Sequence, residues 1–230
     1  MSKLKNTFRK LRARLKPRPK DSHDEQFRGH YIEWRAKRLA AILNHYGPTF
    51  FLGKTLLELG CGHADIGAFF ANLGAKVTCT DARPEHLVVV RRRHPGLKTI
   101  TANLETEWPL GSYDIIIHMG VLYHLKNFTG SLEHACQNCR NLILETEVCD
   151  SDDPNFVLQT QEAGFDQAMS GIGSRPSAEA IEKVLRACGM SYERITDDRC
   201  NSHIHRYNWP VTNTKTWEHG LRRFWFAEKR

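Results

Sequence analysis

Two histidine-bearing stretches carry the residue types that could move a proton. Tyr123 and His124 follow the apolar run Tyr113–Met119, and His203 and His205 lie two residues apart much later in the chain. An imidazole changes its charge near neutral pH and can take a proton from a hydroxyl group, while a phenol can donate a hydrogen bond. These four residues are therefore the candidate catalytic groups.

A glycine-bearing stretch, Leu56–Gly67, reads LLELGCGHADIG and predicts a nucleoside site. Its apolar start, its glycines Gly60 and Gly62 and its helix-compatible end are typical of the strand, turn and helix that open a βαβ unit. A second strand is predicted at Lys76–Thr80, and Asp81 follows it, roughly 20 residues after the first glycine. A carboxylate in that place can accept both hydroxyls of an adenosine ribose.

The charge of this stretch indicates which nucleoside it suits. Asp65 occupies the position where a dinucleotide-binding loop has its third glycine, and Glu58 lies just before the first. Both carboxylates would repel a pyrophosphate, which needs bare backbone N–H groups. S-adenosylmethionine (SAM) has adenosine and ribose but carries a sulfonium and an ammonium instead of phosphates. The stretch therefore favours SAM as the cofactor.

Several blocks carry a resemblance to a known family; they are EWR at 33–35, LELGCG at 57–62, MGVLYH at 119–124, LETE at 144–147 and PSAEAIEKVLRACGM at 176–190. They resemble the wobble-uridine carboxymethyltransferases of tRNA, a branch of the class I SAM-dependent methyltransferases. The resemblance covers roughly Tyr31 to Met190. It implies the fold and the SAM-type cofactor of that family, and it implies an active-site role for Tyr123.

The resemblance has two departures. That family has a sizeable N-terminal region with a lysine that binds the extra carboxylate of carboxy-SAM, whereas this sequence has only a short basic segment there. Its C-terminal arginine block aligns only loosely with Arg222, Arg223 and Trp225. Ordinary SAM and a different acceptor are therefore expected.

The resemblance also places the ligands. Asn103 and Leu104 follow the predicted third strand, where the family recognises the adenine, and Arg35 in a leading helix can pair with the SAM carboxylate. The predicted cofactor-binding residues are Arg35, Glu58, Gly60, Cys61, Gly62, Asp81, Ala82, Asn103, Leu104, His118 and Met119. The predicted acceptor-binding residues are Glu145, Tyr207, Trp209 and Arg223. No metal site is predicted, because the Cys136–Cys139 pair lacks a second pair at a useful spacing.

Hydrophobic periodicity supplies the elements that position these residues. Helices are predicted at 31–46, 66–73, 84–93, 129–139 and 178–188, and strands at 55–59, 76–80, 98–102, 113–119, 141–148, 190–195 and 221–227. Together with the resemblance, this pattern predicts a single α/β domain over 23–230. Its Rossmann-like sheet has seven strands, the last of them antiparallel. Segments 150–176 and 197–219 are predicted to be irregular insertions on the acceptor side.

Residues 1–22 form a segment of a different kind. The first 20 residues carry nine of the 33 lysines and arginines and no acidic residue, so the rest of the chain is close to neutral. Leu4, Phe8, Leu11 and Leu15 are spaced for one face of a basic amphipathic helix. Such a helix suits an anionic membrane surface, a nucleic acid or a partner groove, and it also resembles a mitochondrial presequence.

Cysteine usage and hydropathy suggest a compartment. The seven cysteines have no framework spacing, no signal-peptide-like apolar region precedes them, and no apolar run is long enough to be a transmembrane segment. A cytoplasmic protein with reduced thiols is expected, with mitochondrial targeting by the basic segment as the alternative.

These inferences predict a methyltransferase that acts by in-line displacement with a histidine base. The expected acceptor atom is an oxygen or nitrogen of a small molecule or saccharide. One alternative is a tRNA- or RNA-modifying methyl- or carboxymethyltransferase in which Arg9–Lys20 and the C-terminal arginines bind phosphates. A further alternative is a non-catalytic SAM-binding subunit.

Overall fold

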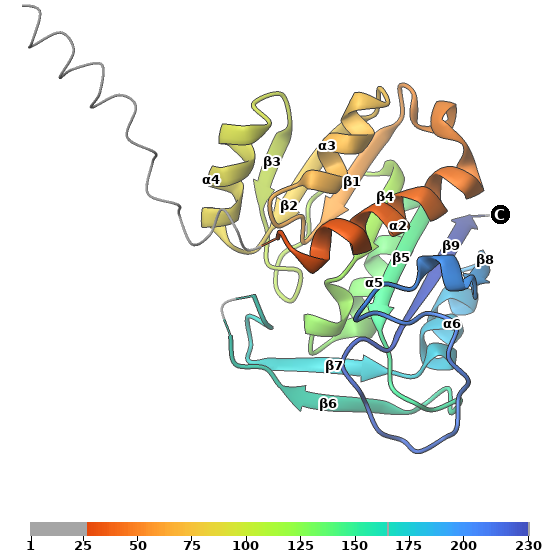
Figure 1. The fold of residues 1–230 in the computed structure, drawn as a ribbon. Coiled ribbons are helices and arrows are strands. Elements are labelled where there is room, and N and C mark those ends of the chain that lie inside the picture. The colour runs from red at the N-terminus through yellow and green to blue at the C-terminus, as the bar shows by residue number, and fades with distance from the viewer. Residues whose placement is uncertain (1–26, 165, 230) are drawn as a thin grey trace, which may run out of the picture.

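A seven-stranded sheet forms the centre of the molecule (Figure 1). The structure is a computed structural model that describes residues 27–164 and 166–229, so the predicted basic segment 1–22 lies outside the described residues. The strand order is β3-β2-β1-β4-β5-β9-β8. Strand β9 runs antiparallel to both of its neighbours, while β1 to β5 are parallel. The predicted sheet with an antiparallel last strand is confirmed.

The element bounds agree with the predicted ranges to within one or two residues. The strands of the sheet are β1 Thr55–Leu59, β2 Lys76–Asp81, β3 Lys98–Thr101, β4 Tyr113–Met119, β5 Cys139–Glu147, β8 Met190–Ile195 and β9 Arg222–Lys229. The α-helices are α2 His30–Tyr46, α3 Asp65–Asn72, α4 Pro84–Arg93, α5 Phe128–Asn138 and α6 Ala178–Ala187. Short 3₁₀ turns lie at η2 Pro48–Phe51, η3 Leu122–His124 and η4 Asp198–Cys200.

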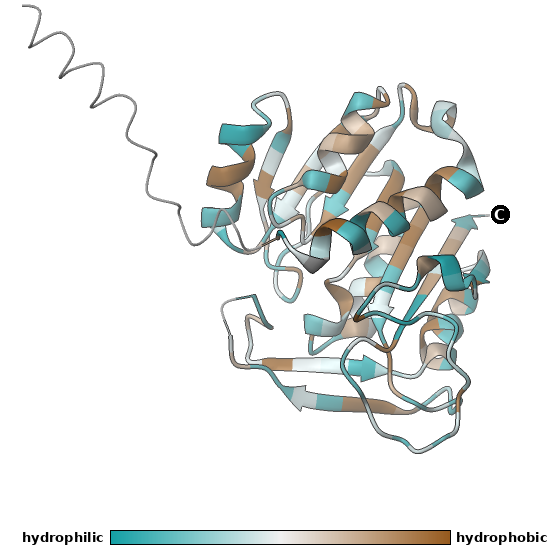
Figure 2. Ribbon diagram, in the orientation of Figure 1, coloured by the Kyte–Doolittle hydropathy of each residue, from teal (hydrophilic) through white to brown (hydrophobic). Residues whose placement is uncertain are grey.

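Alternation along the strands builds two cores, because successive strand residues point to opposite faces. Leu56, Ile115 and Ile143 pack with α2, α3 and α4 on one face. Their neighbours Leu57 and Ile116 pack with α5 and α6 on the other. The strands are hydrophobic on both faces, as expected for a parallel sheet covered by helices, and β1, β4 and β5 are mainly brown in Figure 2.

Two glycines shape the turn between β1 and α3. Gly60 and Gly62 have φ values of 60° and 53°, which lie in the left-handed region that favours glycine. A Cβ at Gly60 would lie 2.7 Å from Cγ2 of Val121, and one at Gly62 would lie 2.8 Å from Cε2 of Phe27. The turn therefore needs glycine for its backbone conformation and for the close approach of the segments that cover it.

The insertion at 150–176 is more regular than the sequence predicts. It contains an antiparallel hairpin of β6 Val157–Gln161 and β7 Ile172–Pro176, which lies beyond the arrowhead end of β5 in Figure 1. The polar, glycine-rich composition of the segment concealed these strands, because the hairpin pairs only with itself and buries little apolar surface. The expectation of an irregular insertion is wrong in this respect.

The second insertion, 197–219, is fastened to the end of β5 by one carboxylate. Asp150 accepts hydrogen bonds from the backbone N–H and hydroxyl groups of both Thr212 and Thr214, at 2.5 to 3.2 Å. Burial would raise the pKa of Asp150, but these hydrogen bonds outweigh it and hold the pKa below its ordinary value. Among the described residues, no helix has the length and apolar character needed to cross a membrane.

Candidate active site

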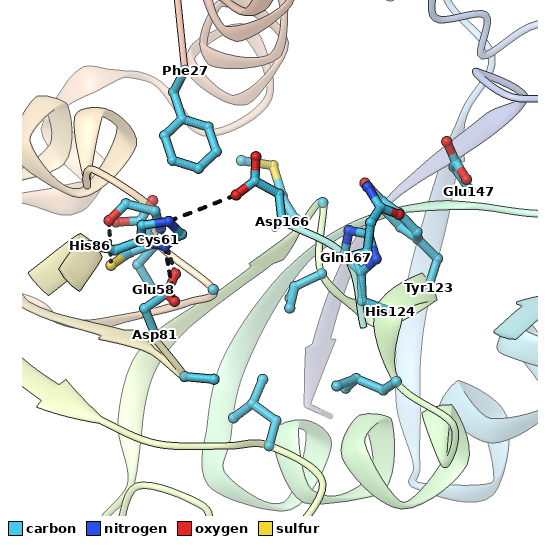
Figure 3. Close-up of a pocket in the computed structure, with 18 of the residues that line it drawn as sticks. Phe27, Glu58, Cys61, Asp81, His86, Tyr123, His124, Glu147, Asp166 and Gln167 are labelled. Atoms are coloured by element: carbon cyan, nitrogen blue, oxygen red, sulfur yellow. Dashed lines mark hydrogen bonds and ion pairs between the residues drawn. The ribbon is translucent and has the colours of Figure 1, made fainter. Parts of the chain in front are cut away.

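A cavity of about 280 Å³ opens where β1, β2, β4 and β5 end at the same edge of the sheet. Figure 3 shows its two sides, with Asp81 and Cys61 on one and Tyr123, His124 and Glu147 on the other. We call the first side the nucleoside half and the second the acceptor half. The predicted catalytic and cofactor-binding residues that line the cavity are Arg35, Glu58, Gly60, Cys61, Gly62, Asp81, Ala82, Asn103, Leu104, Met119, Tyr123, His124 and His205.

Asp81 is the central carboxylate of the nucleoside half. It ends β2, and its Oδ2 accepts a hydrogen bond of 2.9 Å from the backbone N–H of Gly62. Its Oδ1 accepts from the N–H of Arg83 at 2.9 Å and lies 3.1 Å from Nδ1 of His86. Each carboxylate oxygen has about two lone-pair sites, so Oδ2, which has one donor, retains capacity to accept from a ligand hydroxyl.

Arg35 and Asp65 pair above the glycine turn. Nη2 of Arg35 lies 2.8 Å from Oδ2 of Asp65, and it also donates to the backbone carbonyl of Phe27 at 2.8 Å. Arg35 thus reaches the cavity from α2, as predicted, but it is already bound to a carboxylate. A ligand carboxylate would have to share or replace that contact.

Glu58 lies under the turn and is buried at 4% exposure. Its Oε2 accepts a hydrogen bond of 3.0 Å from the backbone N–H of Gly67. Burial nevertheless raises the pKa of Glu58 to about 8, because the charged form loses its hydration. Glu58 is therefore mostly uncharged at neutral pH. The negative charge that the sequence analysis expected beside a cationic ligand is supplied by Asp65 and Asp81 instead.

The raised pKa of Glu58 makes stability depend on pH. Above the ordinary value of 4.5 the unfolded chain releases a proton that the folded protein holds until about pH 8. The unfolded state then binds fewer protons, so the free energy of unfolding falls as pH rises through this window. We expect Glu58→Gln to gain stability over the wild type by up to about 1.4 kcal/mol for each pH unit between 5 and 8.

Urea unfolding curves across that pH range measure this difference. The matched control is Glu218→Gln, whose side chain is 69% exposed and should give a constant difference. A difference for Glu58→Gln that stays constant with pH would show that Glu58 ionises normally in the folded protein.

The adenine side of the cavity is formed by the loop after β3. Asn103 and Leu104 both line the cavity, as predicted. Oδ1 of Asn103 accepts a hydrogen bond of 3.1 Å from the N–H of Glu105, so one of its polar atoms shapes the loop. Its amide nitrogen is the group left to meet a ligand base.

His118 does not belong to this site, contrary to the prediction. It lies on β4 next to Met119, but strand alternation turns it to the α5 face, where Nε2 is 3.2 Å from Oγ of Ser131. Burial lowers the pKa of His118 to about 3, so it is a neutral core residue. Met119 faces the cavity instead.

Tyr123 begins the acceptor half. Its hydroxyl accepts a hydrogen bond of 3.2 Å from Nη2 of Arg222, which leaves the phenolic proton available to a ligand. Burial raises the pKa of Tyr123 to about 12, although Arg222 opposes the shift. Tyr123 therefore remains protonated at neutral pH and acts as a hydrogen-bond donor.

Buried arginines and glutamates alternate behind Tyr123. Arg222 binds Glu145 at 2.9 Å and Glu147 at 3.2 Å. Arg175 binds Glu147 at 2.8 Å and Glu162 at 2.7 Å. Burial would raise the pKa of Glu147, but His219 and the two arginines lower it to about 2. Each buried glutamate of the cluster is thus paired with at least one buried arginine.

His124 is held by the same cluster. Its Nδ1 lies 2.6 Å from Oε2 of Glu162, at the end of β6, and the two side chains are 15% and 3% exposed. The 3₁₀ turn η3 presents His124 to the cavity beside Tyr123, with ring centroids 4.0 Å apart. The structure thus brings together the two residues of the predicted LYH block.

The two late histidines lie in different surroundings. His205 lines the cavity and stacks on Trp34 with ring centroids 3.9 Å apart. Burial, together with Arg222 and Arg38, lowers the pKa of His205 to about 2, so its ring is a poor proton acceptor at neutral pH. His203 is exposed on the loop and lies outside the cavity lining.

None of the four predicted acceptor-binding residues is among those that line the cavity. Glu145 is fully buried and accepts from Arg222, Arg38 and the hydroxyl of Tyr207. Arg223 donates to the backbone carbonyls of Tyr207 and Trp209 at 2.6 and 2.7 Å. Their side chains are therefore absent from the cavity lining, where the prediction placed them.

Two of these differences are shifts of one or two residues along a strand. Arg222 faces the cavity and Arg223 does not, because consecutive strand residues point to opposite faces. Glu147, the last residue of β5, lines the cavity, whereas Glu145 lies two residues earlier in the same strand and does not. Sequence reasoning also missed other residues that line the cavity, among them Asp166, Gln167, Arg175, Trp217 and His219.

Comparison with known proteins identifies the family to which the chain belongs. Residues 31–194 match a protein family described as "Methyltransferase domain". The chain is 26% identical over 177 residues to the tRNA U34 carboxymethyltransferase of Shewanella denitrificans. The aligned residues cover 72% of this chain and 52% of that protein, so the chain spans about half the length of this curated relative.

Solved structures show the same fold. The N-terminal domain of EvdMO1, determined in the presence of S-adenosylhomocysteine (SAH) and D-fucose, has a TM-score of 0.65 at 17% identity and covers 86% of this chain and 83% of that one. Magnesium protoporphyrin IX methyltransferase from Synechocystis, with SAH bound, has a TM-score of 0.59 at 17% identity and covers 98% and 95%.

Proposed function

We propose that this chain, which belongs to the methyltransferase domain family, transfers a methyl group from SAM to an oxygen or nitrogen atom of a small molecule or saccharide. One observation carries the proposal. Asp81, at the end of β2, and the Tyr123–His124 pair, at the end of β4, line the same cavity from opposite sides. One cavity therefore contains both a carboxylate that can bind a nucleoside and side chains that can donate or accept a proton.

The nucleoside half fits SAM. Its wall carries the carboxylates of Asp65 and Asp81, and the turn at Gly60 and Gly62 has no room for side chains. Acidic groups at this place favour a cationic ligand over a pyrophosphate. Asp81 would accept the ribose hydroxyls, and Asn103 and Leu104 would hold the adenine.

Bound SAM supplies a methyl group on a positively charged sulfur, which a nucleophile can displace in line. The chain's own task is to hold the nucleophile close and aligned, since orientation alone provides much of the rate enhancement. Tyr123, which is protonated at neutral pH, donates a hydrogen bond to the acceptor. His124 takes up the proton that the acceptor loses.

The charge of the acceptor half supports a small, uncharged acceptor. Each arginine that lines it, namely Arg38, Arg175 and Arg222, already has a buried glutamate partner. A phosphate or carboxylate would have to displace those glutamates at a large desolvation cost. The presence of D-fucose with EvdMO1 agrees with a saccharide-sized acceptor.

An RNA acceptor is the second candidate, favoured by the similarity to tRNA U34 carboxymethyltransferase. Phosphate contacts by the basic N-terminal segment would make the affinity for tRNA fall steeply with salt. Filter binding of tRNA from 50 to 300 mM salt distinguishes the two. A steep slope, together with methyl label in tRNA and none in small molecules, would replace the small-molecule proposal.

Titration calorimetry of the full chain tests the donor. We expect heat of binding with SAM and SAH and none with NAD. Asp81→Asn should weaken SAM binding by about 10²-fold, because the hydrogen bonds that a charged carboxylate accepts each contribute roughly 1.5–3 kcal/mol.

The matched control for Asp81→Asn is Asp114→Asn. Asp114 also accepts two hydrogen bonds, from the N–H and hydroxyl of Thr55, but it lies at the start of β4, away from the cavity. Its substitution should leave the SAM affinity unchanged. Binding of NAD, or equal effects of the two substitutions, would contradict the assignment of the nucleoside half.

A further inference from the structure

We infer that His124 and Glu162 form a proton-accepting dyad and that the methyl acceptor is consequently a hydroxyl oxygen. This inference rests on the proposed function and narrows it. In it, Glu162 is a positioning residue that acts through His124, and His124 is the base that touches the acceptor.

The contact between the two side chains sets the tautomer of the imidazole. Burial would raise the pKa of Glu162, but hydrogen bonds from His124 and Arg175 outweigh it and hold the pKa below its ordinary value. Glu162 is therefore a carboxylate that can only accept. The 2.6 Å contact requires the proton to be on Nδ1 of His124, so the neutral ring carries its lone pair on Nε2.

Glu162 is itself fixed on both of its oxygens. Oε1 accepts from Nη2 of Arg175 at 2.7 Å, and Oε2 also accepts from the backbone N–H of Ala168 at 2.8 Å. Nη1 of Arg175 donates in turn to the carbonyl of Tyr123 at 2.8 Å. The hairpin β6–β7 thus holds the carboxylate and the turn that carries His124 in one rigid arrangement.

The tautomer aims the free nitrogen at the acceptor. His124 lines the cavity, and among residues 27–164 and 166–229 no side chain or backbone group hydrogen-bonds to its Nε2. The neighbouring histidines cannot replace it. His205 stacks on Trp34, and burial together with Arg222 and Arg38 lowers its pKa to about 2, so its ring is a poor proton acceptor. His219, whose Nδ1 is 3.0 Å from Glu147, has a side chain that is 66% exposed.

A dyad of this kind is needed by one class of acceptor. A hydroxyl is a weak nucleophile until its proton is removed, whereas a neutral amine attacks through its own lone pair. In the step, the acceptor oxygen forms a bond to the methyl carbon as the carbon–sulfur bond breaks, and that electron pair stays on sulfur. The hydroxyl proton moves to Nε2 of His124, and the resulting imidazolium is stabilised by Glu162 until it loses the proton to water.

Long-range proton–nitrogen NMR of the ¹⁵N-histidine-labelled full chain reports the tautomer without any ligand. The His124 signals are assigned by their loss in His124→Asn. At a pH where the ring is neutral, we expect the proton on Nδ1 in the wild type and on Nε2 in Glu162→Gln. A wild-type ring with its proton on Nε2 would overturn the dyad.

Kinetics separate a positioning role from a merely structural one. With methyl-labelled SAM and a cell extract as the acceptor source, Glu162→Gln should lower the transfer rate by about 10–100-fold. The loss should fall on kcat, with the KM for SAM unchanged, because Glu162 acts through His124 in the acceptor half.

The matched control is Glu193→Gln. Glu193 also lies near Nδ1 of a histidine, His45, at 3.5 Å, but its side chain on β8 is 64% exposed and lies outside the cavity lining. Its substitution should change neither the transfer rate nor the His124 tautomer. A loss of rate in Glu162→Gln with an unchanged His124 tautomer would reduce Glu162 to a structural residue and overturn the inference.

The product identifies the acceptor atom. With ¹³C-methyl SAM, the carbon of an O-methyl product has a chemical shift separate from that of an N-methyl product. O-methyl signals support the inference. N-methyl signals would overturn it while leaving the proposed function intact, whereas the absence of both SAM binding and any methylated product would overturn the two together.

Discussion

Replacing His124 by alanine should lower the kcat of methyl transfer by about 10²–10⁴-fold, the usual contribution of a general base. The substitution removes the group that takes the acceptor proton and leaves Glu162 bound to Arg175. SAM binding should change little, because His124 lies in the acceptor half. A radiolabel transfer assay and calorimetry, made on the same protein preparation, measure the two quantities.

His203→Ala is the matched control for this loss. His203 is the exposed histidine of the late loop and lies outside the cavity lining, so its removal should leave kcat unchanged. Equal activity of His124→Ala and the wild type would remove the base from the mechanism. It would also favour an acceptor that attacks without losing a proton first.

Replacing Arg222 by methionine should lower the free energy of unfolding by about 3–5 kcal/mol. Arg222 is 1% exposed and bridges Glu145 and Glu147, which are both fully buried. Methionine fills a similar volume but leaves two buried carboxylates short of a counter-charge. Equilibrium urea unfolding of the two proteins measures the loss.

Arg206→Met is the control for Arg222→Met. Arg206 also pairs with a glutamate, Glu218 at 3.1 Å, but their side chains are 52% and 69% exposed. An exposed pair contributes at most about 1 kcal/mol, so this substitution should cost little. Adding Glu147→Gln to Arg222→Met should recover part of the lost stability, since it removes one of the uncompensated charges. Equal costs for Arg222→Met and Arg206→Met would show that burial of the cluster adds nothing.

The sequence by itself determined the sheet and most of the nucleoside half. These features are strand alternation, the glycine turn and the position of Asp81. Each depends on residues close together in the chain, so a local sequence pattern is enough to predict it. Residues 60–62 and 103–104 accordingly line the cavity as expected. His118 is the exception, because the prediction took two adjacent strand residues where only Met119 could face the ligand.

Only the tertiary structure decided the acceptor half. Glu162 and Arg175 come from a hairpin that pairs with itself alone, and nothing in their local sequence says that they meet His124. The choice of Arg222 over Arg223 follows from which face of β9 looks at the cavity. A one-residue shift of register would have reversed it. Contacts between groups tens of residues apart are fixed by packing and by the pairing of buried charges, and a local pattern contains neither.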